Sequence, residues 1–255
     1  MVQLHTIARG EGDPVVLLHG LFGSARNFGT VQKRLSLHWR VLAMDLRNHG
    51  ESPHAPGMDY ATLAEDVRET LVALNALPCA LIGHSMGGKT AMRLALEHPH
   101  LISRLIVGDI APVAYPPRHH AEIAAMLRLP LRPGLTRAEA DKQLAASIED
   151  PALRGFLLQN LRFNTVPYWR IGLAEIASSL SEIESWPPVP DASRYEGPTL
   201  FVIGGHSSYV QPSHRPLIRQ LFPSARFVTI KRAGHWLHAD DPETFLAVVE
   251  AFLAS

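Results

Sequence analysis

A serine between two glycines stands where the chain passes from a predicted strand into a predicted helix. The segment Gly83-His84-Ser85-Met86-Gly87 follows an apolar run at 80–82 and precedes an amphipathic pattern over 86–98. So tight a turn strains the serine backbone, and the glycines avoid Cβ clashes. The Ser85 hydroxyl is then exposed above the strand end, where the free Met86 N–H can bind an oxyanion. The pattern predicts a nucleophilic serine, the alternative being an ordinary helix N-cap.

A second glycine-containing turn follows the first predicted buried strand. His19-Gly20-Leu21-Phe22-Gly23-Ser24 comes directly after Pro14 to Leu18. A His-Gly pair at a strand end lets the next backbone N–H point into a site at that edge of the sheet, where a second oxyanion donor is needed. We expect Leu21 N–H to be this donor, with Phe22 N–H as the next candidate. The alternative is a glycine-rich turn without chemistry.

A serine hydroxyl needs a base, and the chain offers 14 histidines. His235 lies between the last predicted strand and the C-terminal helix, in a loop that can place an imidazole against the serine. We therefore predict that His235 is the base. His238 is its competitor, but His238 is more simply explained as a loop histidine without a catalytic role. The turn should direct His84 elsewhere, and His119 and His120 are expected to face solvent.

The base in turn needs a carboxylate that orients it and stabilises its charged form. Asp109 ends the predicted strand next to that of the nucleophile, and the chain order Ser, Asp, His fits. The other common position for the acid is the loop at 204–209, which contains none. We predict that Asp109 is this acid, with Glu175 and Asp191 as the reserve candidates. The alternative is that Asp109 caps a helix or stabilises a turn.

Short apolar runs alternate with longer amphipathic ones along most of the chain. Continuous β-branched and leucine runs are typical of strands covered on both faces, and strand–helix alternation predicts a mostly parallel, doubly wound sheet. Val2 to Ala8 should add an antiparallel edge. Asp241 and Pro242 are predicted as N-cap and first residue of the last helix. The predicted strands are Pro14 to Leu18, Val41 to Met44, Ala80 to Ile82, Leu105 to Val107, Thr199 to Ile203 and Phe227 to Ile230; the predicted helices are 24–36, 60–77, 86–98, 212–222 and 242–253.

The stretch from 112 to 190 breaks this alternation. Proline clusters open and close it, no strand pattern is clear, and helical patterns occupy most of it. We predict a helical cap over the end of the sheet, inserted into a core made of 1–111 and 191–255. The alternative is a set of helices packed on a face of the sheet. The helical patterns cover 119–128, 136–148, 150–163 and 168–184.

The composition is that of an ordinary globular protein. Lys plus Arg and Asp plus Glu both number 24, so no long-range attraction to nucleic acid or anionic membranes is expected. The single Cys79 cannot form an internal disulfide. No secretory signal, membrane span or metal-binding motif is found, so we expect a cytoplasmic monomer or small homo-oligomer without metal or cofactor.

Several segments together resemble the α/β-hydrolase superfamily: His19-Gly20, Asp45-Leu46-Arg47-Asn48-His49-Gly50-Glu51-Ser52 and the serine turn. More narrowly, the ten residues from Gly83 to Met92 resemble YbfF-type esterases and their mitochondrial relatives. So do Asp109-Ile110-Ala111-Pro112, Gly204-Gly205 with Ser207, and 234–239. This resemblance implies an α/β-hydrolase fold with a helical cap. It also implies an acid after the strand beside the nucleophile, and acyl-CoA thioesters or short acyl esters as substrates.

The sequence therefore predicts a serine esterase or thioesterase that acts on a small-molecule ester or thioester through an acyl-enzyme. Candidate pocket residues are aromatic, each with a core role as the alternative: Phe22, Trp236, Tyr115, Trp169 and Trp186. Lys89, four residues after Ser85, could tune the site, but an anchoring or solvated lysine is more common there. The rival functions are a carbon–carbon hydrolase or lyase on the same fold, and a non-catalytic ligand receptor.

Overall fold

The computed structural model, which describes residues 1–190 and 192–255, is built on a seven-stranded sheet. Its order is β1-β3-β2-β4-β5-β8-β9, with β1 antiparallel to β3 and every other pair parallel. The predicted strands, the antiparallel edge and the doubly wound sheet are confirmed. The strands are β1 Thr6–Arg9, β2 Pro14–Leu18, β3 Arg40–Met44, β4 Cys79–His84, β5 Ile102–Gly108, β8 Thr199–Gly204 and β9 Ala225–Ile230.

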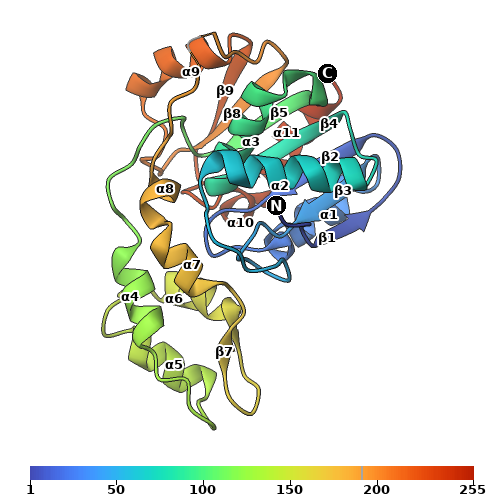
Figure 1. Cartoon of the computed structure of the whole chain (residues 1–255). Coiled ribbons are helices and arrows are strands. Elements are labelled where there is room, and N and C mark those ends of the chain that lie inside the picture. The colour runs from blue at the N-terminus through green and yellow to red at the C-terminus, as the bar shows by residue number, and fades with distance from the viewer. Residues whose placement is uncertain (191) are drawn as a thin grey trace.

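The central strands are apolar because both faces of the sheet are covered. Leu17 of β2 lies in register with Ile82 of β4, and both are buried. Two hydrophobic clusters result, one on each face. Figure 1 shows α2 and α3 in front of the sheet and α11 behind it. The helices of this part are α1 Gly29–Leu35, α2 Tyr60–Ala73, α3 Met86–Glu97, α9 Arg215–Leu221, α10 Leu237–Asp240 and α11 Pro242–Leu253, with 3-10 turns at Ala25–Phe28, Pro99–Leu101 and Pro212–His214.

The last helix begins as the sequence predicts. Asp241 is its N-cap and accepts a hydrogen bond from the N–H of Thr244, while Pro242 is its first residue. Parallel strands deliver their carboxyl ends to one edge of the sheet, and residues that follow β2, β4, β5, β8 and β9 gather there. This is the edge at which all the proposed site residues of the core arrive.

Residues 112–190 form a helical segment that extends below the sheet in Figure 1. Their apolar side chains, such as Met126 and Ile176, continue the hydrophobic cluster on one face of the sheet. One expectation is wrong: a short antiparallel pair, β6 Leu161–Arg162 with β7 Tyr168–Trp169, lies within it. Two residues per strand are too few to give a recognisable alternation. The helices are α4 His120–Arg128, α5 Arg137–Leu144, α6 Pro151–Leu157, α7 Leu173–Ser178 and α8 Leu180–Glu184, with a 3-10 turn at Leu158–Asn160.

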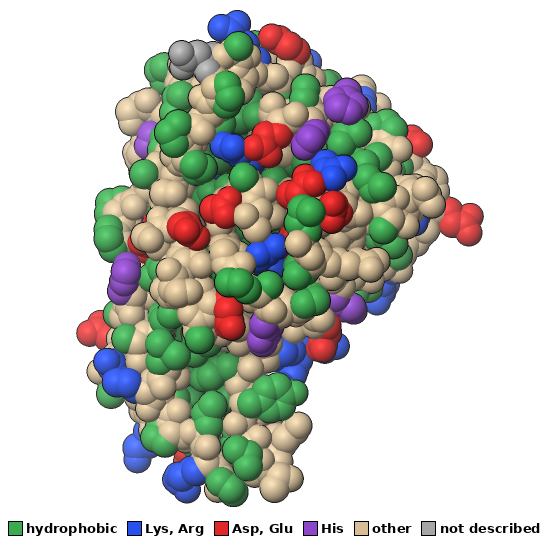
Figure 2. Space-filling model, viewed as in Figure 1, with side chains coloured by type: hydrophobic (Ala, Val, Ile, Leu, Met, Phe, Trp, Pro, Cys, Tyr) green, Lys and Arg blue, Asp and Glu red, His purple; other side chains and the backbone are tan. Residues whose placement is uncertain are grey.

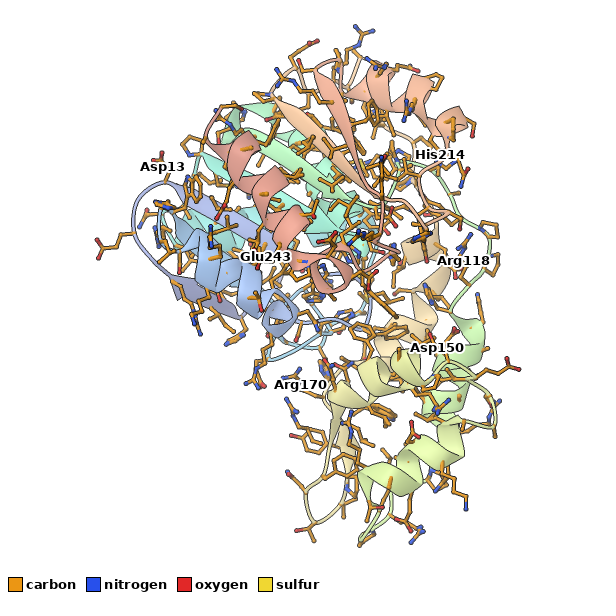
Figure 3. The ribbon with its side chains drawn as sticks, turned by 180° about the vertical axis from the view of Figure 1, so that it is seen from behind. Asp13, Arg118, Asp150, Arg170, His214 and Glu243 are labelled. Carbon is orange, nitrogen blue, oxygen red and sulfur yellow. The ribbon has the colours of Figure 1, made fainter. Side chains whose placement is uncertain are left out.

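Polar contacts fasten this segment to the core. Arg170 and Arg118 lie where the two parts meet (Figure 3). Arg170 forms an ion pair with Glu51 at 3.1 Å, and the Gly172 N–H donates to the Asn48 carbonyl at 2.9 Å. The segment is thus held close to the loop that follows β3.

Basic and acidic side chains are interspersed on the surface shown in Figure 2, in keeping with equal numbers of the two kinds. Within 1–190 and 192–255, no helix has both the length and the apolar character needed to cross a membrane.

Candidate active site

Ser85 sits in a strained turn between β4 and α3. Its φ of 52° and ψ of −120° fall in a region that L-residues rarely adopt. The turn closes because two glycines permit it: a Cβ on Gly83 would lie 2.2 Å from the Gly87 carbonyl oxygen, and one on Gly87 would lie 2.3 Å from the Leu18 carbonyl oxygen. The serine is therefore presented above the carboxyl end of β4, as the sequence pattern predicts.

Asp109 and His235 meet although 126 residues separate them in the chain. The His235 Nδ1 lies 2.7 Å from Asp109 Oδ2, and the carboxylate is fully buried. Gly204 N–H donates to the other oxygen at 3.0 Å, and the Ser207 hydroxyl donates to Oδ2. Because an ionised carboxylate only accepts, Nδ1 must carry the proton and Nε2 is left as a proton acceptor.

Ser85 and His235 line the same cavity. The Ser85 hydroxyl makes no hydrogen bond with His235, or with any other residue that the structure describes. Catalytic hydrogen bonds often tighten only when substrate is bound, so the arrangement remains compatible with proton transfer between these two groups.

The loop after β2 brings a backbone donor to the same place. Phe22 has a φ of 61°, and its N–H donates to His49 Nε2 at 3.1 Å. This contact occupies the Phe22 N–H, which was the second candidate after Leu21 for the oxyanion donor of this loop. The Leu21 N–H has no acceptor in the described part of the chain, and Met86 is the first residue of α3, where N–H groups lack helical partners. The two N–H groups predicted from the sequence are thus free.

His49 is a supporting residue whose role the sequence alone does not reveal. It is completely buried, and its Nδ1 contacts the Arg47 carbonyl at 2.9 Å. Burial, with the nearby His19 as the next cause, lowers the pKa of His49 to about 3, so the ring is neutral and can accept the Phe22 N–H. The 45–52 motif follows β3 and so lies at the same edge of the sheet, which places His49 near the site but does not indicate the N–H that it accepts.

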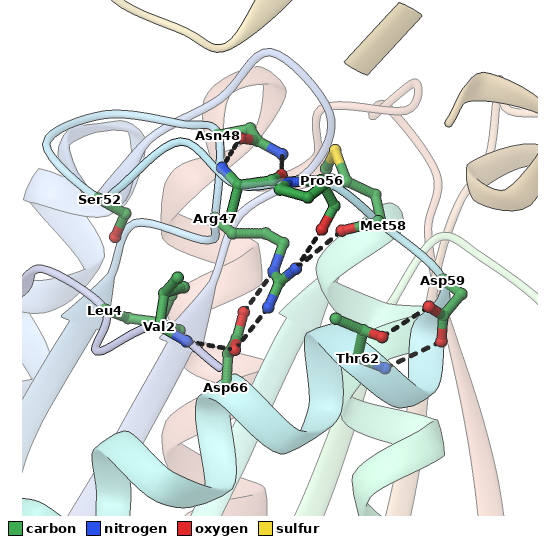
Figure 4. Close-up of polar contacts among 12 residues, drawn as sticks. Val2, Leu4, Arg47, Asn48, Ser52, Pro56, Met58, Asp59, Thr62 and Asp66 are labelled. Carbon is green, nitrogen blue, oxygen red and sulfur yellow. Dashed lines mark hydrogen bonds and ion pairs between the residues drawn. The ribbon is translucent and has the colours of Figure 1, made fainter. Parts of the chain in front are cut away.

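The backbone of that loop is fixed by a buried ion pair, shown in Figure 4. Arg47 Nε lies 2.5 Å and Nη2 2.7 Å from the two oxygens of Asp66, on α2. Its Nη1 also donates to the carbonyls of Pro56 and Gly57, both at 2.9 Å. With its donors paired, Arg47 holds the loop that carries His49 against the core.

The remaining histidines near the site differ in their surroundings. His84 Nε2 lies 2.7 Å from the His235 carbonyl oxygen, so His84 supports the backbone that carries the predicted base. His238 lies in α10 rather than in a loop; burial lowers its pKa to about 4, and its ring packs 4.6 Å from that of Phe28. His120 is exposed as expected. The solvated position expected for His119 is wrong, because its half-buried ring lies 5.9 Å from Phe22 and lines the cavity.

Tyr209 is a second residue that sequence reasoning missed. Its ring stacks on His235 with centroids 4.0 Å apart and planes 19° apart. The Tyr115 hydroxyl donates to the Tyr209 carbonyl at 2.7 Å and accepts the Ala111 N–H at 2.9 Å. An aromatic wall thus fixes the orientation of the imidazole ring. The loop at 204–209, which contains no acidic residue, thus contributes an aromatic ring to the site instead of a carboxylate.

Two cavities open at Ser85. The larger, about 440 Å³, is mainly apolar, and Phe22 and Trp236 line it as predicted pocket residues together with Phe156 of α6. The smaller, about 40 Å³, is lined by Tyr115, Lys89 and Ile183 among others. Trp169 reaches neither: its indole N–H donates to the Met126 carbonyl at 3.1 Å within the helical segment. Trp186 packs against Tyr60 instead.

Lys89 is buried one helical turn after Ser85, at 1% exposure. Its Nζ donates to the Ser185 carbonyl at 2.5 Å and to the Glu184 carbonyl at 3.3 Å, and lies 4.8 Å from the Tyr115 ring centroid. Burial lowers its pKa to about 7, against the opposing effect of the Glu184 carboxylate. It ties the nucleophile helix to the end of α8, the anchoring role that the sequence left open.

The sequence offered two further candidates for the acid, Glu175 and Asp191. In the described part of the chain, the Glu175 carboxylate on α7 makes no hydrogen bond to an imidazole, and Asp191 lies outside the described residues. Across 1–190 and 192–255, no group of three or more His, Cys, Asp or Glu side chains is placed to hold a metal ion.

Comparison with known proteins places this geometry in a family. A family model described as "alpha/beta hydrolase fold" matches residues 13–242. The mouse protein named sn-1-specific diacylglycerol lipase ABHD11 is 44% identical over 94% of this chain and 80% of its own length. Esterase YbfF of Escherichia coli is 35% identical over 95% of this chain and 94% of its own.

One solved structure has nearly the same fold as this chain. The structure titled "Marine microorganism esterase" superposes with a TM-score of 0.95 and 38% sequence identity, covering 99% of this chain and all of that one. The resemblance in fold thus includes the helical segment 112–190 as well as the sheet.

Proposed function

The chain belongs to the alpha/beta-hydrolase family, in the branch of the YbfF-type esterases, and from that premise we propose that it is a serine hydrolase of carboxylic esters. Ser85 is the nucleophile, His235 the base and Asp109 the carboxylate that orients the base. The observation that carries the proposal is the 2.7 Å contact between His235 and Asp109 at the rim of the cavity that contains Ser85. The names of the similar proteins, an esterase and a lipase, support ester bonds as the target.

The reaction proceeds in two halves. His235 Nε2 takes the proton of the Ser85 hydroxyl while the serine oxygen bonds to the carbonyl carbon of the ester. The carbonyl oxygen becomes an oxyanion, which the N–H groups of Leu21 and Met86 bind. His235 then returns its proton to the leaving alkoxide or thiolate as that bond breaks, and an acyl-serine remains. Water repeats the sequence, releasing the acid and restoring the serine.

The strained backbone of Ser85 and the paired carboxylate serve this chemistry by holding the groups in place beforehand. Asp109 stabilises the imidazolium that forms twice per cycle, and its two other donors, Gly204 N–H and the Ser207 hydroxyl, fix its orientation. Residues 112–190 act as a cap, because His119 and Phe156 from this segment complete the cavity over Ser85. Thioesters fit the same steps, with a thiolate as the leaving group.

Replacing Ser85 by alanine tests this function. Hydrolysis of p-nitrophenyl acetate should fall by at least about 1,000-fold, while the far-ultraviolet circular dichroism spectrum stays unchanged. Ser178→Ala is the matched control, because this exposed serine on α7 lies away from both cavities. Undiminished turnover by Ser85→Ala would overturn the proposal. Binding without turnover in the unaltered protein would favour a receptor, and cleavage of 1,3-diketones but not esters would favour a carbon–carbon hydrolase.

A further inference from the structure

The β6–β7 hairpin concentrates exposed apolar side chains. Of the seven large hydrophobic residues that are exposed in the described part of the chain, three lie close together in it: Phe163, Val166 and Tyr168, at 40%, 53% and 47% exposure. Grouped apolar side chains, unlike scattered ones, mark surfaces that contact a partner or a membrane. The hairpin projects from the lower end of the helical segment in Figure 1, and Figure 2 shows hydrophobic side chains gathered on the surface of this end.

Strand pairing decides which side chains share the outer face of the hairpin. Arg162 lies opposite Tyr168, and Leu161 lies opposite Trp169. Partners across an antiparallel pair point to the same face, and successive residues alternate between faces. The face of Leu161 and Trp169 is the inner one, because Leu161 is buried and the Trp169 indole donates to the Met126 carbonyl. Arg162 and Tyr168 therefore share the outer face.

A groove between this hairpin and the core is lined by four arginines and by Phe163. Within 1–190 and 192–255, no acidic side chain lines it. The equal numbers of acidic and basic residues in the whole chain thus conceal a local excess of positive charge. The arginines come from the turn after β2, the start of α5, β6 and the residue after β7: Arg26, Arg137, Arg162 and Arg170.

Most of this charge has no anionic partner in the described chain. The guanidinium groups of Arg26 and Arg162 form no ion pair or hydrogen bond there, and that of Arg137 donates to backbone carbonyls. Arg170, at the junction of the helical segment and the core (Figure 3), pairs with Glu51, but its buried Nε has no acceptor among the described residues. Because guanidinium groups bind phosphate through paired N–H donors, the groove suits phosphate oxygens from outside the chain.

We infer that this surface, the β6–β7 hairpin together with the arginine groove, docks on an anionic lipid bilayer. The arginines bind headgroup phosphates, while Phe163, Val166 and Tyr168 enter the boundary between headgroups and acyl chains, where aromatic side chains are favoured. A free phosphate ion or an acidic protein would match the charges but leave the projecting apolar tip in water. A neutral bilayer would accept the tip but leave the excess positive charge uncompensated.

Docking in this orientation brings the active site close to the bilayer. Gln159 lines both the arginine groove and the larger cavity at Ser85, so the two spaces adjoin. A lipid ester leaving the bilayer would have a short path along the groove to the nucleophile. The inference goes beyond the proposed hydrolysis and does not depend on it, because binding to a bilayer requires no turnover.

Cosedimentation of the full chain with vesicles tests the docking. Partition onto mixed phosphatidylglycerol and phosphatidylcholine vesicles should exceed partition onto phosphatidylcholine alone at least about tenfold, since each arginine near an anionic surface contributes roughly fivefold. Salt at about 0.5 M should weaken this binding by screening the arginines. The Ser85→Ala protein should bind like the unaltered one, so failure of docking and failure of hydrolysis are separate results. Absence of binding, or equal binding to both kinds of vesicle, would overturn the inference.

Charge variants test the groove. Arg26→Gln combined with Arg162→Gln should lower the partition coefficient on the anionic vesicles at least about tenfold. The matched control combines Arg219→Gln with Arg226→Gln, which removes the same charge from exposed positions of α9 and β9, at the opposite end of the molecule in Figure 1. Its partition coefficient should change less than about twofold, since charges beyond a Debye length from the bilayer are screened. Equal losses in the two proteins would overturn the role of the groove.

Apolar variants test the hairpin. Phe163→Ser combined with Val166→Ser should lower the partition coefficient at least about fivefold, because two apolar side chains no longer enter the bilayer. Leu37→Ser combined with Val72→Ser, at exposed positions outside the hairpin, is the matched control and should bind like the unaltered protein.

Two outcomes would replace the membrane by another ligand. Binding that depends on the arginines, is abolished by inorganic phosphate and ignores the hairpin variant would identify a phosphate site and overturn the docking surface. Arginine-dependent binding of polyglutamate, without binding to vesicles, would make an acidic protein the partner and overturn it as well.

Discussion

Replacing Asp109 by asparagine keeps the size and shape of the side chain but removes its charge and one of its two acceptor oxygens. In the native protein Oδ2 accepts both His235 Nδ1–H and the Ser207 hydroxyl, while Oδ1 accepts Gly204 N–H at 3.0 Å. An asparagine has one oxygen and one NH2 group for these positions. If its NH2 faced Gly204, two buried donors would oppose each other, so the oxygen should take that position.

The amide NH2 then faces His235. A donor at this position makes Nδ1 the acceptor and places the ring proton on Nε2, the nitrogen that must remove the proton of Ser85. We expect kcat for p-nitrophenyl acetate to fall by about 10,000-fold, as the same change does in serine proteases. That ratio corresponds to about 5.4 kcal/mol of lost transition-state stabilisation, at 1.36 kcal/mol for each tenfold. KM should change little.

Initial rates at pH 7 to 9, with thermal unfolding as the check on folding, provide the assay. Glu175→Gln is the control: it neutralises another candidate carboxylate, and its kcat should stay within threefold of the native value. A folded Asp109→Asn protein that keeps more than a tenth of native kcat would refute the role of Asp109. A large loss in Asp191→Asn instead would identify the other sequence candidate as the acid.

Two further residues allow tests of the surroundings of the site. Burial lowers the pKa of Lys89 to about 7 from 10.5, so between these values the unfolded chain binds a proton that the folded chain has released, and stability rises with pH. From pH 7 to pH 9, the free energy of unfolding in urea should therefore rise by about 2 kcal/mol more in the native protein than in Lys89→Met; parallel curves would contradict the buried amine. His49→Ala should cost about 1–3 kcal/mol of stability, because it leaves the buried Phe22 N–H without an acceptor, and should lower kcat more than it changes KM. His49→Gln, which keeps an acceptor, should recover part of both losses; no difference between the two variants would contradict this role.

Much of the fold could be predicted from the sequence because local patterns and global topology agree. The apolar run at Pro14 to Leu18 has to be a buried strand, and a parallel sheet places the residues after β2, β4, β5 and β9 at one edge. The Ser85 turn is marked by its glycines, since only they allow the close backbone approach found there. The positions of Asp109 and His235 follow from the same topology.

Other features depend on long-range packing, which leaves no local signal. Tyr209 lies in a loop whose polar, glycine-containing sequence does not reveal that its ring stacks on His235. Trp169 is aromatic, as pocket residues often are, yet its indole N–H donates to the Met126 carbonyl within the helical segment 112–190. The division of space around Ser85 into a small and a large cavity also depends on how α8 and α6 pack over the sheet, and no spacing in the sequence encodes it.

The central claim is that Ser85 is a nucleophile activated by His235, and covalent trapping tests it most directly. The protein is incubated with a fluorophosphonate, and its intact mass and peptide masses are measured over time. The account predicts one added phosphonyl group, located on Ser85, with labelling at least about 100-fold slower in His235→Ala and absent in Ser85→Ala. An unlabelled Ser85, or labelling at an equal rate without His235, would contradict it.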